Sequence, residues 1–152
     1  MKNINKGFTL IELLVVVAII GIITSVGMSF LGDARNRGSD VGVKTNLEGA
    51  KKQAELYYLN NNNTYGTFVA ASCPATATAG SVFNDSIVVR AIAKAASVGG
   101  NTTRCAASGQ DYAAAVSYKG SSSSWCVDGQ GVSKQYAGTP TAAVNGSTYR
   151  CN

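Results

Sequence analysis

The feature that most constrains this chain is an apolar run near its start. The run reads GFTLIELLVVVAIIGII over residues 7–23 and continues in apolar and small residues to Leu31. Glu12 is the only charged residue in it, and residues 13–31 carry no charge. A helix over residues 13–31 would be about 28 Å long, close to the ~30 Å hydrocarbon core of a bilayer. The run therefore predicts a helix that spans a membrane or lies in the core of an assembly.

The lone carboxylate of Glu12 needs a partner, because a charge inside a membrane helix costs about 3 kcal/mol. A carboxylate in an apolar medium is tolerated only when it is paired or protonated. One interpretation is that Glu12 satisfies the start of its own helix, where the helix dipole favours an anion. The other is that it pairs with a cation from a neighbouring chain. A secretory signal peptide does not fit, because the run is too long and no A-x-A-like site follows it.

The sequence Lys6-Gly7 followed by FTLIE and the apolar run resembles the N-terminal signature of type IV prepilins and of the related pseudopilins of type II secretion. The resemblance implies that a prepilin peptidase cuts between Gly7 and Phe8, and that Phe8 is then N-methylated. It also implies that Glu12 pairs with the new terminal amine of a neighbouring subunit during filament assembly. The cut would create a cationic amine one helical turn before Glu12, which agrees with the need of this carboxylate for a partner.

The fold class expected from this resemblance is α+β: a type IV pilin fold with a long N-terminal helix packed on a small antiparallel β-sheet domain. We expect four segments: a leader peptide at 1–7, a transmembrane or filament-core helix at 8–31, an amphipathic second half of the helix at 32–62, and a C-terminal globular domain at 63–152. Six glycines from Gly21 to Gly49 weaken this helix, since each costs about 1 kcal/mol relative to alanine. Bending or local melting in a filament is expected between Gly21 and Gly32.

The second half of the helix is amphipathic from Asp33 onward. Apolar residues recur at helical spacing and are expected to face the domain: Val43, Leu47, Ala50, Ala54 and Tyr57. Charged residues are expected to face outward: Lys44, Glu48, Lys51, Lys52 and Glu55.

Beyond the long helix, the sequence predicts one further helix and a small sheet. Residues 67–80 read as a loop. Residues 81–98 read as a helix capped by Asn84 or Asp85, with Phe83, Ile87, Ala91 and Ala95 on its apolar face; a strand at 86–90 is the alternative. An alternating pattern predicts a three-stranded antiparallel sheet with strands at 112–118, 125–128 and 132–137, the last two joined as a hairpin. Residues 139–152 read as a loop, with a strand at its end as an option.

The four cysteines all follow the apolar run, at Cys73, Cys105, Cys126 and Cys151. An even number in a small domain outside the cytoplasm indicates two disulfides, for which three connectivities exist. Cys73–Cys105 and Cys126–Cys151 are favoured, because sequential loops are local and the last pair resembles the C-terminal disulfide loop of many pilins. The chain has neither histidine nor a CxxC pair, which argues against a zinc site.

The sequence lacks the residues that most catalytic sites need. Without histidine it cannot form a histidine-based triad, and its glycines do not form a phosphate loop. We therefore expect no enzyme activity, no cofactor and no metal. The net charge of +5 is mild and scattered, so it gives no support for a nucleic-acid partner.

The expected function is that of a structural subunit of a type IV pilus, which serves adhesion, motility or DNA uptake. The expected partners are copies of itself and related pilins, the prepilin peptidase, the inner-membrane assembly machinery, and the membrane before assembly. Two alternatives stay open: a type II secretion pseudopilin, and a membrane-anchored extracytoplasmic binding module that never assembles.

The expected location is the bacterial inner membrane for the single-pass precursor and the cell surface for the assembled pilus. The positive charges do not favour a cytoplasmic N-terminus, because Arg35, Arg37 and Lys44 follow the span while Lys2 and Lys6 precede it. The C-terminal domain is nevertheless expected outside, since disulfides need an oxidising compartment and the family has that topology.

Overall fold

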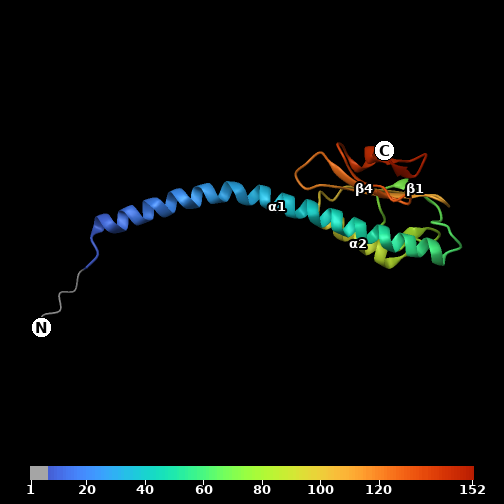
Figure 1. Ribbon diagram of the computed structural model, residues 1–152, viewed down its shortest axis with the longest axis horizontal. Coiled ribbons are helices and arrows are strands. Elements are labelled where there is room, and N and C mark those ends of the chain that lie inside the picture. Colours follow the sequence, from blue (N-terminus) through green and yellow to red (C-terminus); the bar gives the residue numbers. More distant parts are fainter. Residues whose placement is uncertain (1–6) are drawn as a thin grey trace, which may run out of the picture. The chain divides into compact units, whose positions relative to one another are not determined.

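The structure, a computed structural model, describes residues 7–152, apart from the side chains of residues 27–30. Of the expected leader, only Gly7 belongs to the described residues, and Lys2 and Lys6 lie outside them. The chain divides into two compact units, Met1–Arg35 and Asn36–Asn152. Helix α1 (Leu10–Asn60) belongs to both of them (Figure 1).

In the first unit, α1 is an unbroken helix from Leu10 onward, and this includes Gly21 and Gly32. Two polar side chains in the apolar run bond within the helix. The hydroxyl of Thr24 donates to the carbonyl of Ile20 at 2.8 Å, and that of Ser25 donates to the carbonyl of Ile22 at 2.8 Å. These bonds satisfy both hydroxyls locally, so the run can carry them without a partner chain. Bending near Gly21 to Gly32 stays a prediction for the filament.

In the second unit, one face of α1 is buried against the domain. Val43, Leu47, Ala50 and Ala54 are all buried, and Tyr57 is half-buried at the edge of the same core. Their spacing of three and four residues keeps them on one side of the helix. The predicted stripe is confirmed.

Two of the five charged residues expected to face outward turn instead toward the sheet. The Lys44 ammonium lies 4.9 Å from the ring centroid of Trp125 and 5.7 Å from that of Tyr118. The Lys51 ammonium donates to the Gly131 carbonyl at 3.0 Å and to the Ser133 hydroxyl at 2.8 Å. The reason is that a long aliphatic stem beside the buried stripe can lie along the domain and present its charged end to polar groups there.

The domain contains a five-stranded antiparallel sheet in the order β1-β2-β3-β4-β5. Its strands are β1 (Phe68–Ala71), β2 (Thr103–Ala107), β3 (Tyr112–Ser117), β4 (Ser124–Asp128) and β5 (Ser133–Tyr136). The α+β class and the β4–β5 hairpin are confirmed, but the expectation of three strands is wrong. Strand β1 lies where residues 67–80 read as a loop, and β2 was not recognised.

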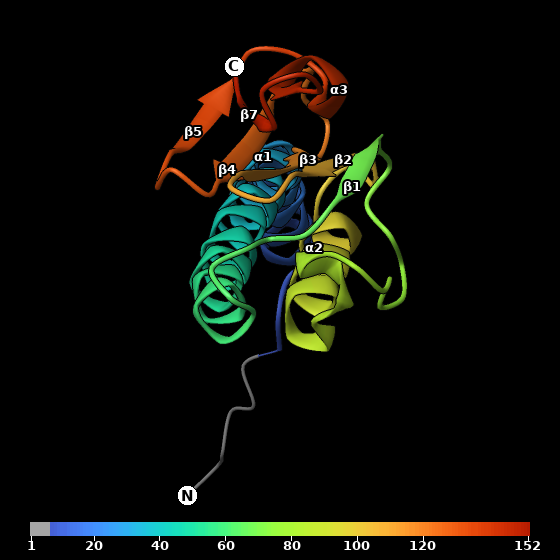
Figure 2. The same cartoon turned by 90° about the vertical axis from the view of Figure 1, so that its right-hand side faces the viewer.

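The strand expected at 112–118 is confirmed as β3, whereas β2 lacks an alternating pattern because both faces of the sheet are covered. Figure 2 shows α1 and α2 on one side of the sheet and α3 on the other. On β3, Tyr112, Ala114 and Val116 belong to the core on the α1 side, whereas Ala113 and Ala115 belong to the core on the α3 side. A strand buried on both faces reads as a continuous small or apolar run.

The second helix, α2 (Ser86–Val98), follows a short 3-10 turn, η1 (Val82–Asn84). The Asp85 carboxylate caps α2 by accepting from the backbone N–H groups of Ile87 and Val88 at 2.7 and 3.1 Å. The helix is confirmed and the alternative strand at 86–90 is wrong. The expected apolar face is also partly wrong, since Ile87 is 49% exposed. The buried face consists of Val88, Val89, Ile92 and Ala95, and the spacing of 88, 92 and 95 keeps these residues on one side of the helix.

The C-terminal segment is more structured than the loop expected from its sequence. It forms a short helix, α3 (Pro140–Ala143), and a second small sheet of β6 (Val144–Asn145) and β7 (Arg150–Cys151). Ala143 and Val144 close the core on the outer face of the large sheet. The segment thereby gives the sheet its second covered side.

Candidate processing and assembly site

The expected cleavage point lies just before the helix. Gly7, Phe8 and Thr9 have no regular secondary structure, and α1 begins at Leu10. The Phe8 side chain is 85% exposed. Among the described residues other than its chain neighbours, no heavy atom lies within 4 Å of where a Cβ on Gly7 would stand. The bond between Gly7 and Phe8 is therefore open to an approaching enzyme in this chain.

Thr9 and Glu12 form a reciprocal cap at the start of α1. The backbone N–H of Thr9 donates to Glu12 Oε2 at 2.9 Å, and the Thr9 hydroxyl donates to the same oxygen at 2.8 Å. The backbone N–H of Glu12 lies 3.3 Å from the Thr9 hydroxyl oxygen, which accepts from it. This arrangement is a capping box, in which N-cap and N3 side chains satisfy each other's backbone donors.

The capping box gives Glu12 a partner within its own chain, which is one of the two interpretations left open by the sequence. All of the carboxylate's hydrogen bonds among the described residues go to Oε2. Pairing with a neighbour's amine stays a prediction. Sequence reasoning overlooked Thr9, although the Thr-x-x-Glu pattern ahead of an apolar run is a recognised sign of this cap.

Beyond the cap and up to Val26, the helix presents an apolar surface that the described part of the chain leaves exposed. Exposed fractions of its large apolar side chains up to Val26 range from 47% at Val16 to 88% at Leu10. By length and composition, α1 is able to cross a membrane. Large exposed apolar patches mark membrane or protein interaction sites, so this surface and the Glu12 cap together form the candidate assembly site.

The structure joins Cys73 to Cys105 and Cys126 to Cys151, one of the three connectivities that four cysteines allow. The first bridge fastens the chain after the edge strand β1 to β2. The second joins β4 to β7, at the C-terminal end of the chain. Each bridge ties a segment with few core residues to a central strand.

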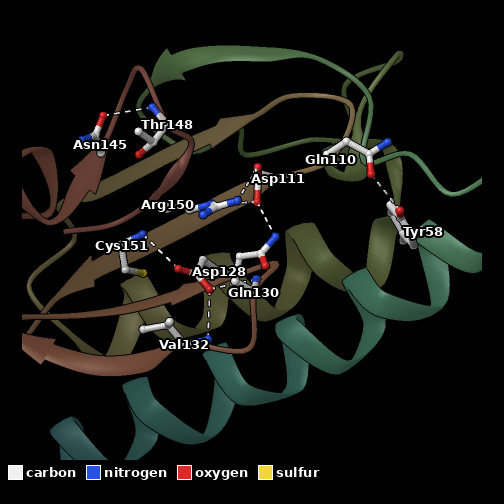
Figure 3. A network of polar contacts seen from close by, with 10 residues as sticks. All are labelled: Tyr58, Gln110, Asp111, Asp128, Gln130, Val132, Asn145, Thr148, Arg150 and Cys151. Atoms are coloured by element: carbon white, nitrogen blue, oxygen red, sulfur yellow. Dashed lines mark hydrogen bonds and ion pairs between the residues drawn. The ribbon is translucent and has the colours of Figure 1, made fainter.

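A polar network joins the turns at one end of the domain to the C-terminal strand (Figure 3). The Arg150 guanidinium contacts the Asp111 carboxylate with Nε–Oδ1 at 3.0 Å, and this hydrogen-bonded pair raises the pKa of Arg150. The Gln130 amide donates to the same oxygen of Asp111 at 2.7 Å. Nearby, the carboxylate of Asp128 is almost fully buried and accepts only backbone N–H groups, including that of Cys151. None of these polar residues was singled out from the sequence for such a role.

Tyr58 on α1, Tyr65 after it and Tyr112 on β3 pack together at the core. The ring centroids of Tyr58 and Tyr65 are 4.6 Å apart, and those of Tyr65 and Tyr112 are 4.8 Å apart. Burial is the main cause that raises the pKa of Tyr112 well above its ordinary value. Tilted rings at these distances attract one another beyond their buried area.

Comparison with known proteins agrees with these features. The family described as the prokaryotic N-terminal methylation motif matches residues 2–28. The type IV wide pilus major component PilA4 of Thermus thermophilus is 48% identical over 63 residues, which is 41% of this chain and 47% of that protein. A fimbrial protein of Neisseria meningitidis is 37% identical over 71 residues, 47% of this chain and 42% of that protein. The chain thus spans about half the length of the curated relatives it matches, and no solved structure matches it significantly.

The methylation motif, the apolar helix that follows it and the small antiparallel sheet agree with the α+β fold of type IV pilins. The N-terminal part of the chain is similar to type IV pilins, and the matched relatives are named as pilins and fimbrial proteins.

Proposed function

We propose that this chain is the structural subunit of a type IV pilus. In this proposal a prepilin peptidase cuts between Gly7 and Phe8, Phe8 is N-methylated, and copies of the chain assemble through the apolar part of α1. The methylation motif over residues 2–28 supports the processing step. The names of the relatives, a wide pilus major component among them, support the pilus.

The observation that carries this proposal is the uncovered apolar surface of α1. Every large apolar side chain from Leu10 to Val26 is about half exposed or more. Burying such surface is favourable by about 25 cal/mol per Å², so the helix is stable only in lipid or against other helices. Lipid covers it in the single-pass precursor, and the helices of neighbouring subunits cover it in the fibre.

Glu12 supplies the specificity of assembly in this proposal. Its Oε2 is occupied by Thr9, while Oε1 is available to a second donor. Cleavage exposes an amine at Phe8, and a neighbour's amine would pair with Glu12 where water is excluded. An ion pair gains strength in a low dielectric, and a buried carboxylate left unpaired is strongly unfavourable. Subunits would therefore be accepted only at the axial position where amine and carboxylate meet.

The location follows from the same elements. The precursor would lie in the bacterial inner membrane through α1 and be handed to the assembly machinery there. The domain with its two disulfides would lie in the oxidising compartment outside. The pilus is favoured over a type II secretion pseudopilus and over a non-assembling anchored module, because the matched relatives are named as pilins and fimbrial proteins.

The test is to express Glu12→Ala and Thr9→Val chains in the bacterium that makes the protein and to measure sheared surface fibres by mass spectrometry. We expect Glu12→Ala to be cut to a chain starting at Phe8 but to yield at least tenfold less fibre. Thr9→Val removes the capping hydroxyl and keeps the carboxylate, so we expect it to retain most of the fibre.

Equal loss in the two variants would mean that Glu12 acts through its own helix cap and not through a neighbour. Full assembly of Glu12→Ala would contradict the proposed role of the carboxylate. Wild-type chain that still begins at Met1 and never enters a fibre would contradict the proposed function as a whole.

A further inference from the structure

The carboxylate of Asp128 holds two segments that are distant in sequence. Asp128 ends strand β4 and is 1% exposed. Its Oδ1 accepts from the backbone N–H groups of Gln130 and Val132, both at 3.0 Å, and so fixes the β4–β5 turn. Its Oδ2 accepts from the backbone N–H of Cys151 at 3.1 Å (Figure 3). One buried carboxylate therefore joins β4 to the C-terminal strand β7 without any covalent bond.

The residue held by Asp128 is the one that forms the second disulfide. Cys126 precedes Asp128 by two positions on β4, so both point to the same face of the sheet. The strand register agrees, because Cys126 lies opposite Ala115 and Asp128 opposite Ala113, which share the core on the α3 side. Cys151 is thus bound twice to one strand, by its backbone to Asp128 and by its sulfur to Cys126.

The neighbours of Cys151 are also held by contacts that do not depend on the disulfide. The Arg150 guanidinium binds the Asp111 carboxylate. The backbone N–H of Asn152 donates to the Ala143 carbonyl at 2.9 Å. The bond from Cys151 to Asp128 is the central one of the three and the one with a fully buried charged acceptor. Hydrogen bonds to charged groups are stronger than neutral ones.

From these contacts we infer that Asp128 is a positioning residue for the Cys126–Cys151 disulfide. In the reduced chain it holds the Cys151 backbone beside Cys126, so this pair forms in preference to the other pairings. The oxidant is a low-molecular-weight disulfide such as oxidised glutathione. One protein thiolate attacks it and releases one glutathione thiolate; the second then attacks the mixed disulfide, forms the Cys126–Cys151 bond and releases the other glutathione. Two protein thiols are oxidised and one glutathione disulfide is reduced.

Asp128→Asn tests this role with little change in shape. The amide oxygen can still accept from the turn, but its NH₂ then faces the N–H of Cys151, and the hold on Cys151 is lost. The full-length chain in detergent is equilibrated with reduced and oxidised glutathione, and the effective concentration of each cysteine pair is measured by mass spectrometry after alkylation. We expect the effective concentration of the Cys126–Cys151 pair to fall at least about tenfold.

Two controls show whether the effect is local. The Cys73–Cys105 pair in the same chain has no contact with Asp128 among the described residues, and its effective concentration should stay within about twofold, because distant sites act independently. Asp85→Asn is the matched variant, since Asp85 also accepts two backbone N–H groups and asparagine caps helices as well as aspartate does. It should leave Cys126–Cys151 unchanged. No change in Asp128→Asn, or an equal fall of both pairs, overturns the inference.

A second measurement leaves Asp128 intact and serves where Asp128→Asn does not fold. The double variant Cys126→Ser with Cys151→Ser removes the covalent bond, and amide hydrogen exchange is followed at residue 151. If Asp128 still binds the Cys151 N–H without the disulfide, this amide stays protected by a factor of at least about ten relative to an unfolded peptide. Exchange at the unfolded rate would mean that the disulfide positions the strand, and would refute the inference.

Discussion

The two parts of α1 are both regular helix, but their apolar surfaces require different partners. From Leu13 to Leu31 the sequence of the helix is apolar or small on all sides, and its large side chains up to Val26 are about half exposed or more. After residue 36 the buried apolar residues form one stripe, on which Val43 and Leu47 are fully buried. A helix with one apolar stripe finds its partner in its own domain, whereas a helix apolar all round needs a partner from outside. The difference in pattern thus separates the folding part of the helix from the assembling part.

The largest expected effect comes from shortening a leucine in each part. Leu47 is fully buried, so Leu47→Ala should lower the free energy of unfolding of the domain by about 3 kcal/mol through lost burial and a cavity. Leu14 is 65% exposed, and Leu14→Ala should change the free energy of unfolding of the domain by less than about 0.5 kcal/mol. Denaturant unfolding in detergent, followed by the fluorescence of Trp125, measures both. Similar losses would mean that the two parts of the helix fold as one unit and would break the comparison.

The dependence of domain stability on alkaline pH tests whether the tyrosines of the second unit are buried. Burial, with a smaller effect of the nearby Asp40 carboxylate, raises the pKa of Tyr118 to about 12. An unfolded tyrosine has a pKa near 10, so the unfolded chain loses this proton first. The stabilising contribution is therefore complete below pH ~10 and falls as the pH rises toward ~12.

The expected slope for one such tyrosine is at most about 1.4 kcal/mol of unfolding free energy per pH unit. Tyr118→Phe should reduce the slope measured by denaturant unfolding between pH ~10 and ~12, and Tyr112 should contribute in the same direction because burial raises its pKa also. An unchanged slope in Tyr118→Phe would show that this ring is solvated in the folded domain.

The starts of the two helices offer a smaller contrast. Asp85→Ala removes the cap of α2 and a 2.8 Å hydrogen bond from the Gln53 amide. It should lower the stability of the domain by about 1 kcal/mol. Thr9→Val weakens the cap of α1 in the first unit and should leave the domain unchanged, while amide exchange near Leu10 becomes faster. Loss of domain stability in Thr9→Val would contradict this independence.

The smallest expected effect concerns two lysines on the second part of α1. Lys44→Met keeps the aliphatic stem and removes the charge over Trp125, and should lower stability by about 0.5 kcal/mol. Lys52 is exposed, and Lys52→Met should have no measurable effect. The measurement is denaturant unfolding in parallel. Equal effects would show that Lys44 faces solvent, as the sequence pattern had suggested.

The sequence predicted best the elements whose pattern is local. The stripe from Val43 to Ala54 follows the helical period. The β4–β5 hairpin is predicted by the turn sequence Gly129-Gln130-Gly131, which lies between the two strands. Both depend on spacing within a single segment. The same holds for the family signature around Glu12, which lies in one short stretch.

The elements that the sequence did not predict depend on distant partners. Strand β1 has four residues and lies at the edge of the sheet, where it pairs with β2. The Cys73–Cys105 bridge beside this pair joins residues that are 32 positions apart in sequence, so the pairing depends on the tertiary fold. The buried face of α2 is chosen by the core it meets, and for this reason Ile87 is exposed although it fits the helical period. The cap formed by Thr9 could have been found from the Thr-x-x-Glu spacing. The role of Asp128 could not, because the third backbone N–H that donates to its carboxylate belongs to Cys151, 23 residues away.

The two covered faces of β3 restrict where this domain can change over evolutionary time. A substitution at Ala113 or Ala115 would press on α3, and one at Ala114 would press on the core beside α1. New side chains are accommodated more easily where the chain leaves the sheet, as in the serine-rich turn at 121–123. If the domain forms the outer wall of a fibre, diversity among strains should collect at these turns, while the alanine strand stays nearly invariant beneath them.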